Sequence, residues 1–111
     1  MPYIENRIVH DADSHTMELP NWFDEFATAE VKAAFRARYR TRPMDDVVAM
    51  HQSADYRARN VEDLMIRKNY DALGSFDASD RVEALELIGV ASQLVFPTSP
   101  NVWLESLEHG D

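Results

Sequence analysis

The sequence predicts an α/β protein with parallel strands, and three observations lead to this fold class. Residues 7–12 form a short run with β-branched side chains, which is typical of a strand. Residues 78–97 have the pattern of a helix, a tight turn at Gly89, an apolar strand and a stop at Pro97. The stretch between these two segments is mainly helical in its periodicity. An order of strand, helix and strand belongs to proteins with parallel sheets.

Composition places the chain among globular proteins. It has 111 residues, 45% of them hydrophobic, no cysteine and a formal net charge of −9. This length fits one domain but not a complete (β/α)₈ barrel, which needs about 250 residues. The lack of cysteine excludes disulfides, Cys-ligated zinc and iron–sulfur sites. We find neither a signal-peptide pattern nor an apolar run of about 18 residues, so we expect a soluble, cytoplasmic protein without membrane contact. The acidic balance argues against nucleic-acid binding.

The charges are unevenly distributed. Residues 32–68 hold 9 of the 11 basic residues and carry a net charge of +4, whereas the rest of the chain carries −13. The basic stretch can be a solvated helical face, or a site for an anionic substrate or an acidic partner surface.

A helical insert is predicted over residues 20–74. Apolar residues recur there at helical spacing and form a stripe that we interpret as core: Trp22, Phe23, Phe26, Val31, Phe35 and Tyr39. Thr28 can cap a helix that runs to about Arg40, and Asn60 can cap another. His51 lies in this insert and is interpreted as a surface or core histidine, with contact to substrate in a complete enzyme as the alternative.

The last third of the chain has the clearest signals. Asp77 or Ser79 can cap a helix over 78–88 whose apolar face is Val82, Leu85 and Ile88. Gly89 stands where a left-handed residue ends a helix. The strand near 91–96 contains an apolar run that is typical of a strand buried on both faces. We expect it to pair in parallel with the strand near 7–12.

The strongest chemical signal follows the first strand. Side chains at alternate positions of a strand point the same way, so Asp11, Asp13 and His15 are predicted to line one face, with Ile8, His10 and Ala12 on the other. Two carboxylates and an imidazole suit a hard or borderline divalent cation. The same residues can also form an ordinary polar turn.

Two segments in the same order resemble a known family. Residues 8–20, Ile-Val-His-Asp-Ala-Asp-Ser-His-Thr-Met-Glu-Leu-Pro, resemble the opening strand of the amidohydrolase-related family, the metal-dependent hydrolases and decarboxylases typified by aminocarboxymuconate-semialdehyde decarboxylase. Residues 80–90, followed by Gln93-Leu94-Val95-Phe96-Pro97-Thr98, resemble its first barrel helix and second strand. Many members have His where this chain has Asp13.

The resemblance implies that residues 1–111 are a single partial domain, the N-terminal part of a (β/α)₈ TIM barrel with a helical insert between strands 1 and 2. Asp13 and His15 match the family's first metal ligands, and Asp11 and Glu18 are candidate supporting acids. The expected cofactor is a divalent metal ion, with Zn²⁺ favoured and Mn²⁺, Fe²⁺ and Mg²⁺ left open by the oxygen ligand.

The resemblance further implies a hydrolase, or a lyase of the decarboxylase type, that acts on a small carbonyl or carboxylate substrate. The other ligands of the family would lie beyond Asp111, so we expect the isolated 111-residue chain to be inactive and to form homo-oligomers. The alternative is a free-standing helical module that acts by oligomerisation or partner binding. A reading frame that continues past Asp111, or the intact mass of the protein, distinguishes the two.

Overall fold

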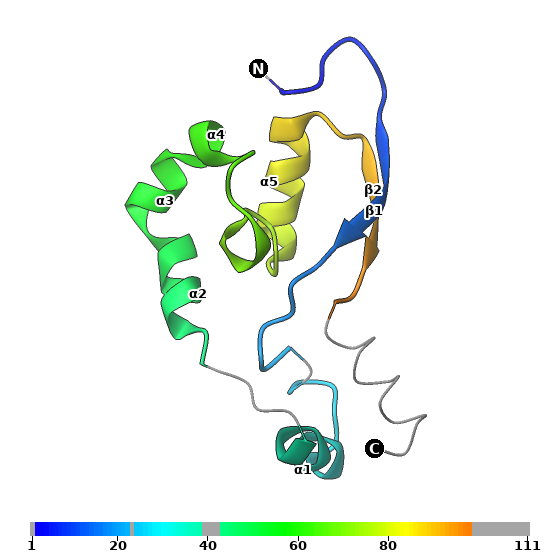
Figure 1. Ribbon diagram of the computed structural model, residues 1–111, viewed down its shortest axis with the longest axis vertical. Coiled ribbons are helices and arrows are strands. Elements are labelled where there is room, and N and C mark those ends of the chain that lie inside the picture. The colour runs from blue at the N-terminus through cyan, green and yellow to red at the C-terminus, as the bar shows by residue number, and fades with distance from the viewer. Residues whose placement is uncertain (1, 23, 39–42, 99–111) are drawn as a thin grey trace.

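The protein, in the computed structural model, is a mixed α/β structure whose strands lie beside a layer of helices. Residues 2–22, 24–38 and 43–98 are described. In chain order the elements are β1 (His10–His15), α1 (Ala29–Arg38), α2 (Asp45–Gln52), α3 (Ala54–Ala58), α4 (Asn60–Asp63), the 3₁₀ turn η1 (Asn69–Asp71), α5 (Ala78–Ile88) and β2 (Ser92–Phe96). Helix α5 lies between the two strands and helices α2 to α4 (Figure 1).

The two strands pair in parallel, which confirms the predicted pairing. His10 is opposite Ser92 and His15 is opposite Phe96, so the carboxyl ends of both strands meet at one edge. The register shifts between Asp11 and Ser14, where β1 has one residue more than β2. This irregularity is a β-bulge, and it changes which side chains share a face.

Strand β1 begins later than predicted. The sequence placed it near 7–12, whereas it runs from His10 to His15. The polar residues after Ala12 continue the strand because β2 supplies backbone partners, and even Thr16 donates its N–H to the carbonyl of Phe96 at 3.0 Å. Pairing therefore overrides the low strand propensity of Asp and Ser.

Helix α5 occupies the range 78–88 that the sequence predicts. Asp77 accepts a hydrogen bond from the N–H of Asp80 at 3.0 Å, as an N-cap residue does. Gly89 ends the helix with φ 91°. The predicted apolar face is wrong at Val82, which is exposed; Ala84 is buried instead, and Leu87 packs against the core.

The core lies between α5 and the helical insert. Tyr56 of α3, Leu73 and Ala84 form its centre, and the partly buried Met50, Leu64 and Leu87 pack around them. The side chain of Arg57 reaches from α3 to Asp80 of α5 with two hydrogen bonds of 2.6 and 2.9 Å. The insert is thus fixed to the helix that returns to the sheet.

The apolar stripe of residues 22–39 does not form a continuous core, contrary to the prediction. The helix near Thr28 is present as α1, but residues 20–22 and 24–26 form turns. Phe35 is buried, whereas Phe26 is 82% exposed. Phe23 and Tyr39 lie outside the described residues. Helix α1 lies at one end of the structure, away from the sheet (Figure 1), so the stripe has no sheet face to cover.

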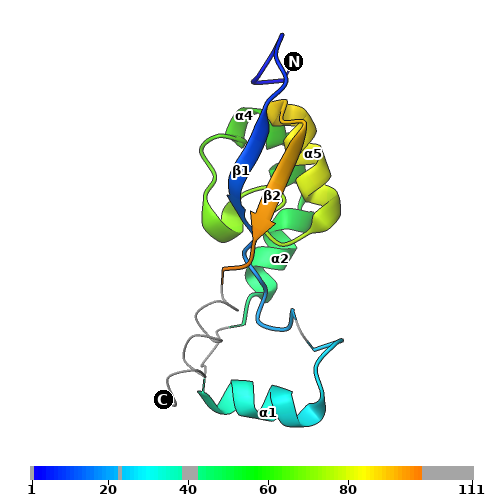
Figure 2. The same ribbon diagram turned by 90° about the vertical axis from the view of Figure 1, so that its right-hand side faces the viewer.

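Strand β2 is not buried on both faces, and this prediction is also wrong. Leu94, Val95 and Phe96 are 58%, 41% and 39% exposed. Figure 2 shows both strands in front of the helices, with no helix of the described residues over the outer face of the sheet. The run therefore has the composition of a buried strand, although its apolar side chains are exposed.

None of the helices in the described part of the chain has the length and hydrophobicity that a membrane crossing requires.

Candidate metal centre

Asp13 and His15 lie together at the carboxyl end of β1. The Oδ1 atom of Asp13 is 3.3 Å from Nε2 of His15, and the two side chains are 85% and 51% exposed. The ring of His15 also lies near that of Phe96, with 5.8 Å between ring centroids. The pair faces outward at the edge where both parallel strands end, which is where α/β enzymes place their catalytic side chains.

Asp11 is not on the face of Asp13 and His15, so the predicted three-residue face is wrong. The bulge adds a residue between Asp11 and Ser14 and brings both of these side chains to the side of α5. The carboxylate of Asp11 accepts hydrogen bonds from the backbone N–H of Asp13 at 3.0 Å and from Nε2 of Gln93 at 3.1 Å.

Glu18 lies beyond the strand and joins the segments that follow β1 and β2. Its Oε1 accepts from the backbone N–H of Thr98 at 2.9 Å, and its carbonyl accepts from the hydroxyl of Tyr70, also at 2.9 Å. The side chain of Thr98 donates to the carbonyl of Thr16 at 2.7 Å. In this structure Glu18 holds backbone at the strand ends.

Asp13 and His15 offer an oxygen and a nitrogen donor that suit a divalent cation, which is two of the four donors of a tetrahedral site. In a tetrahedral zinc site with ligands at about 2.0–2.1 Å, neighbouring donor atoms are about 3.4 Å apart, close to the 3.3 Å between these two atoms. Within residues 2–22, 24–38 and 43–98 there is no group of three or more His, Asp or Glu side chains that could hold a metal ion. The pair therefore supplies two donors, and the other positions need donors from elsewhere.

Arg81 of α5 lies beneath this edge, and we did not assign it a role from the sequence. Its guanidinium donates to the carbonyl of His15 at 2.9 Å, the hydroxyl of Ser14 at 3.0 Å, Oε1 of Gln93 at 3.2 Å and the carbonyl of Gly74 at 2.8 Å. Burial lowers the pKa of Arg81, and the nearby carboxylate of Asp11 opposes this shift. The available signal was Gln93, a polar residue directly before the apolar run Leu94-Val95-Phe96 of β2.

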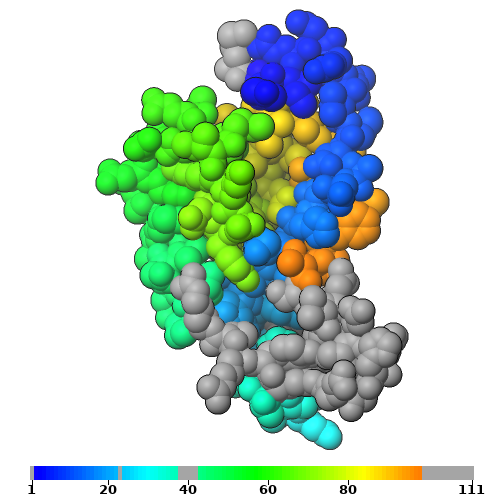
Figure 3. Space-filling view, viewed as in Figure 1, coloured from blue at the N-terminus to red at the C-terminus, as the bar shows by residue number. Residues whose placement is uncertain are grey.

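A cavity of about 240 Å³ opens beside the pair. It is lined by His15 and Met17, by Arg81 of α5, and by Asn69, Ala72, Leu73 and Ser75. In the space-filling view, β1 and the segment after α4 flank the surface of α5 (Figure 3). Of the candidate metal pair, His15 borders this space.

His51 is a core residue. It is buried, its ring packs 4.4 Å from Tyr56 and 4.6 Å from Phe76, and Nε2 lies 2.7 Å from the carbonyl of Tyr70. Its other ring nitrogen has no hydrogen-bond partner within the described residues.

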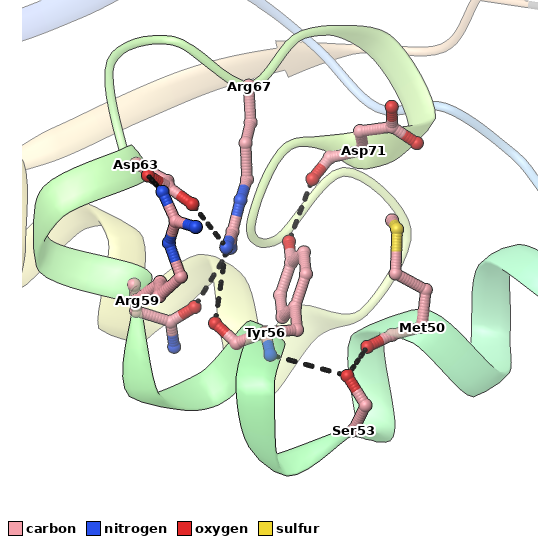
Figure 4. A network of polar contacts seen from close by, with 8 residues as sticks. Met50, Ser53, Tyr56, Arg59, Asp63, Arg67 and Asp71 are labelled. Carbon is pink, nitrogen blue, oxygen red and sulfur yellow. Dashed lines mark hydrogen bonds and ion pairs between the residues drawn. The ribbon is translucent and has the colours of Figure 1, made fainter.

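The described arginines of the basic stretch are largely neutralised within the chain. Ion pairs join Arg36 to Asp24, Arg57 to Asp80, and both Arg59 and Arg67 to Asp63. Figure 4 shows Arg67 between Asp63 and Tyr56; its guanidinium carbon is 3.6 Å from the centroid of the Tyr56 ring. These contacts favour the solvated, internally paired face over an anion site.

Comparison of the chain with protein-family models, curated proteins and solved structures found no match.

Proposed function

We propose that this chain is the opening part of a metal-dependent hydrolase or non-oxidative decarboxylase of the (β/α)₈ barrel type, acting on a small carbonyl or carboxylate substrate. The observation that carries the proposal is the Asp13–His15 pair at the carboxyl end of a parallel strand. The sequence resemblance of residues 8–20 and 80–98 also supports it, because it covers both strands and the helix between them.

In the proposed enzyme, Asp13 and His15 hold the cation through Oδ1 and Nε2. A divalent cation there supplies acidity to water and polarises a carbonyl or carboxylate group. The carboxylate of Asp13 offsets part of the positive charge, and neutral His15 binds through its ring nitrogen. The exposed apolar side chains of β2 suit a strand that neighbouring barrel elements cover.

Titration calorimetry of the 111-residue chain with Zn²⁺ and Mn²⁺ tests the metal site. We expect weak binding of one ion, because two donors leave most positions to water. Asp13→Ala and His15→Ala should each weaken the binding at least about tenfold, since each removes one of two donors. His10→Ala is the matched control: this histidine lies on the same strand, and its ring bonds to Ser92 at 2.7 Å.

The control should bind like the wild-type chain. Absence of binding by the wild-type chain, or binding that survives the double substitution of Asp13 and His15, would refute the metal pair. Submicromolar affinity that is lost in the variants would instead show a complete site within this chain, contrary to the proposed partial one.

A second candidate function is a partner-binding module without catalytic activity. The exposed apolar side chains of Ile8, Phe26 and Leu94 favour it. Continuation of the reading frame past Asp111 into further β/α units supports the enzyme, whereas a naturally short chain without metal affinity supports the module.

A further inference from the structure

The geometry of the metal pair depends on groups that do not bind metal. Asp13 and His15 flank Ser14 at the carboxyl end of a bulged strand. A bulge leaves the extra residue without its regular ladder partner, so other groups must hold the backbone there. In this chain those groups are side chains, and they form one connected path.

The path begins at Arg81 and ends at the backbone of Asp13. Arg81 donates to Oε1 of Gln93 at 3.2 Å, Gln93 donates to Oδ2 of Asp11 at 3.1 Å, and Oδ1 of Asp11 accepts from the N–H of Asp13 at 3.0 Å. A second branch is direct, from Arg81 to the carbonyl of His15 at 2.9 Å. One guanidinium therefore acts on the backbone of both metal-binding residues.

Hydrogen-bond chemistry fixes the direction of this path. A guanidinium only donates and an ionised carboxylate only accepts, so the amide of Gln93 satisfies both in one orientation alone. A flipped amide would direct its NH₂ group at Arg81 and its oxygen at Asp11, and both contacts would be lost. The path thus specifies the position of Asp11, and through it the position of the Asp13 amide.

We propose that Arg81 is the positioning residue of this site: through Gln93 and Asp11, and directly through the carbonyl of His15, it sets the separation of the Asp13 and His15 side chains. Asp11 accordingly acts as a positioning residue and not as a ligand. This inference rests on the proposed function, because it concerns the same metal pair. Groups that orient metal ligands typically change metal affinity about 10–100-fold when they are removed.

Two variants interrupt the path at different points, and a third is a matched control. Arg81→Lys keeps the charge but lacks the planar fork that reaches four acceptors. Gln93→Met removes the bond that Gln93 accepts from Arg81 and the bond that it donates to Asp11, and it leaves the bonds of Arg81 to Gly74, Ser14 and His15 in place. Arg57→Lys removes the two-bond pair with Asp80, which also joins α5 to its surroundings but has no connection to β1.

The readouts are the Zn²⁺ affinity by calorimetry, the thermal midpoint, and the hydrogen-exchange rate of the Asp13 amide without metal. We expect both path variants to lose about tenfold in Zn²⁺ affinity and to exchange the Asp13 amide faster. The control variant, Arg57→Lys, should have a lower thermal midpoint. Its Zn²⁺ affinity and the exchange rate of its Asp13 amide should equal those of the wild-type chain. If Arg81→Lys does not fold, Gln93→Met carries the test.

The outcomes separate the two proposals. If the wild-type chain binds no Zn²⁺, the proposed function fails and the positioning role fails with it. If the wild-type chain binds Zn²⁺ and both path variants bind equally well, the role of Arg81 is refuted and the metal pair stands. If the control variant loses as much Zn²⁺ affinity as the two path variants, the role of Arg81 is also refuted, because the loss would then follow from lower overall stability.

Discussion

Tyr56 shows how its surroundings set the chemistry of a single side chain. It is buried at the centre of the core, its hydroxyl donates to the carbonyl of Asp71 at 2.8 Å, and Arg67 stacks on its ring. Burial raises the pKa of Tyr56 above its ordinary value of 10.0, although the hydrogen bond and charge of Arg67 lower it in part. The neutral form is therefore favoured more strongly in the folded chain than in the unfolded one.

This shift predicts a loss of stability in alkali. Because the pKa is higher in the folded state, the contribution is complete below pH 10 and is lost as the pH rises through the folded pKa. We expect the free energy of unfolding, measured by urea denaturation, to fall as the pH rises above about 10, and to fall less in Tyr56→Phe. Tyr3→Phe, at an exposed tyrosine, should retain the wild-type slope; an unchanged slope in Tyr56→Phe would contradict the prediction.

The residues of the site were partly predictable at this scale. Asp13 and His15 are two positions apart, the spacing at which side chains of a strand point the same way, and they do lie together. Asp11 was misplaced because strand alternation assumes a regular ladder, and nothing in the residues themselves announces the bulge. Arg81 escaped assignment because its acceptors include carbonyls of Gly74 and His15, which no side-chain pattern reveals.

Among the elements, α5 is the one that the sequence describes best, since its start and end are both local. Asp77 caps it through a bond three residues away, and Gly89 ends it in the left-handed region. Strand β1 was misplaced by three residues because its extent depends on β2, which is distant in the sequence. Local signals predict helix ends, whereas strand ends are decided by the partner.

Gly89 should therefore be intolerant of substitution. Its φ of 91° is unfavourable for a residue with a side chain, and an added Cβ would collide with the carbonyl of Ile4. We expect Gly89→Ala to destabilise the chain by more than about 1 kcal/mol in urea denaturation. Ala91→Gly, just after the turn, serves as a comparison at an exposed position and should cost less; a neutral Gly89→Ala would show that the turn is not needed.

The whole molecule is more extended than its length requires. Its radius of gyration is 16.4 Å, compared with about 13 Å for a compact chain of this size. No large side chain in the described residues is fully buried, and the outer face of the sheet carries exposed apolar residues. A sheet of this kind needs further structure against it.

We accordingly expect the 111-residue chain to self-associate at micromolar concentration, as measured by sedimentation velocity. Leu94→Lys should weaken the association, because it places a charge on the exposed strand β2. Val61→Lys, at an exposed apolar position on α4, is the matched control and should leave the association unchanged. A monomer that unfolds cooperatively would contradict this expectation and favour the free-standing module.

The pairing of β1 with β2 also sets a schedule for synthesis on the ribosome. His10 and Ser92 are 82 residues apart, so at about 5–20 residues per second β1 waits roughly 4–16 s for its partner to be translated. The sequence of β1, His-Asp-Ala-Asp-Ser-His, contains no apolar run through which it could aggregate with other nascent chains during this delay. The aggregation-prone strand, Ser-Gln-Leu-Val-Phe, is made second, when the strand that it pairs with already exists. The order of the two strands along the chain thus shortens the time for which the apolar strand lacks a partner.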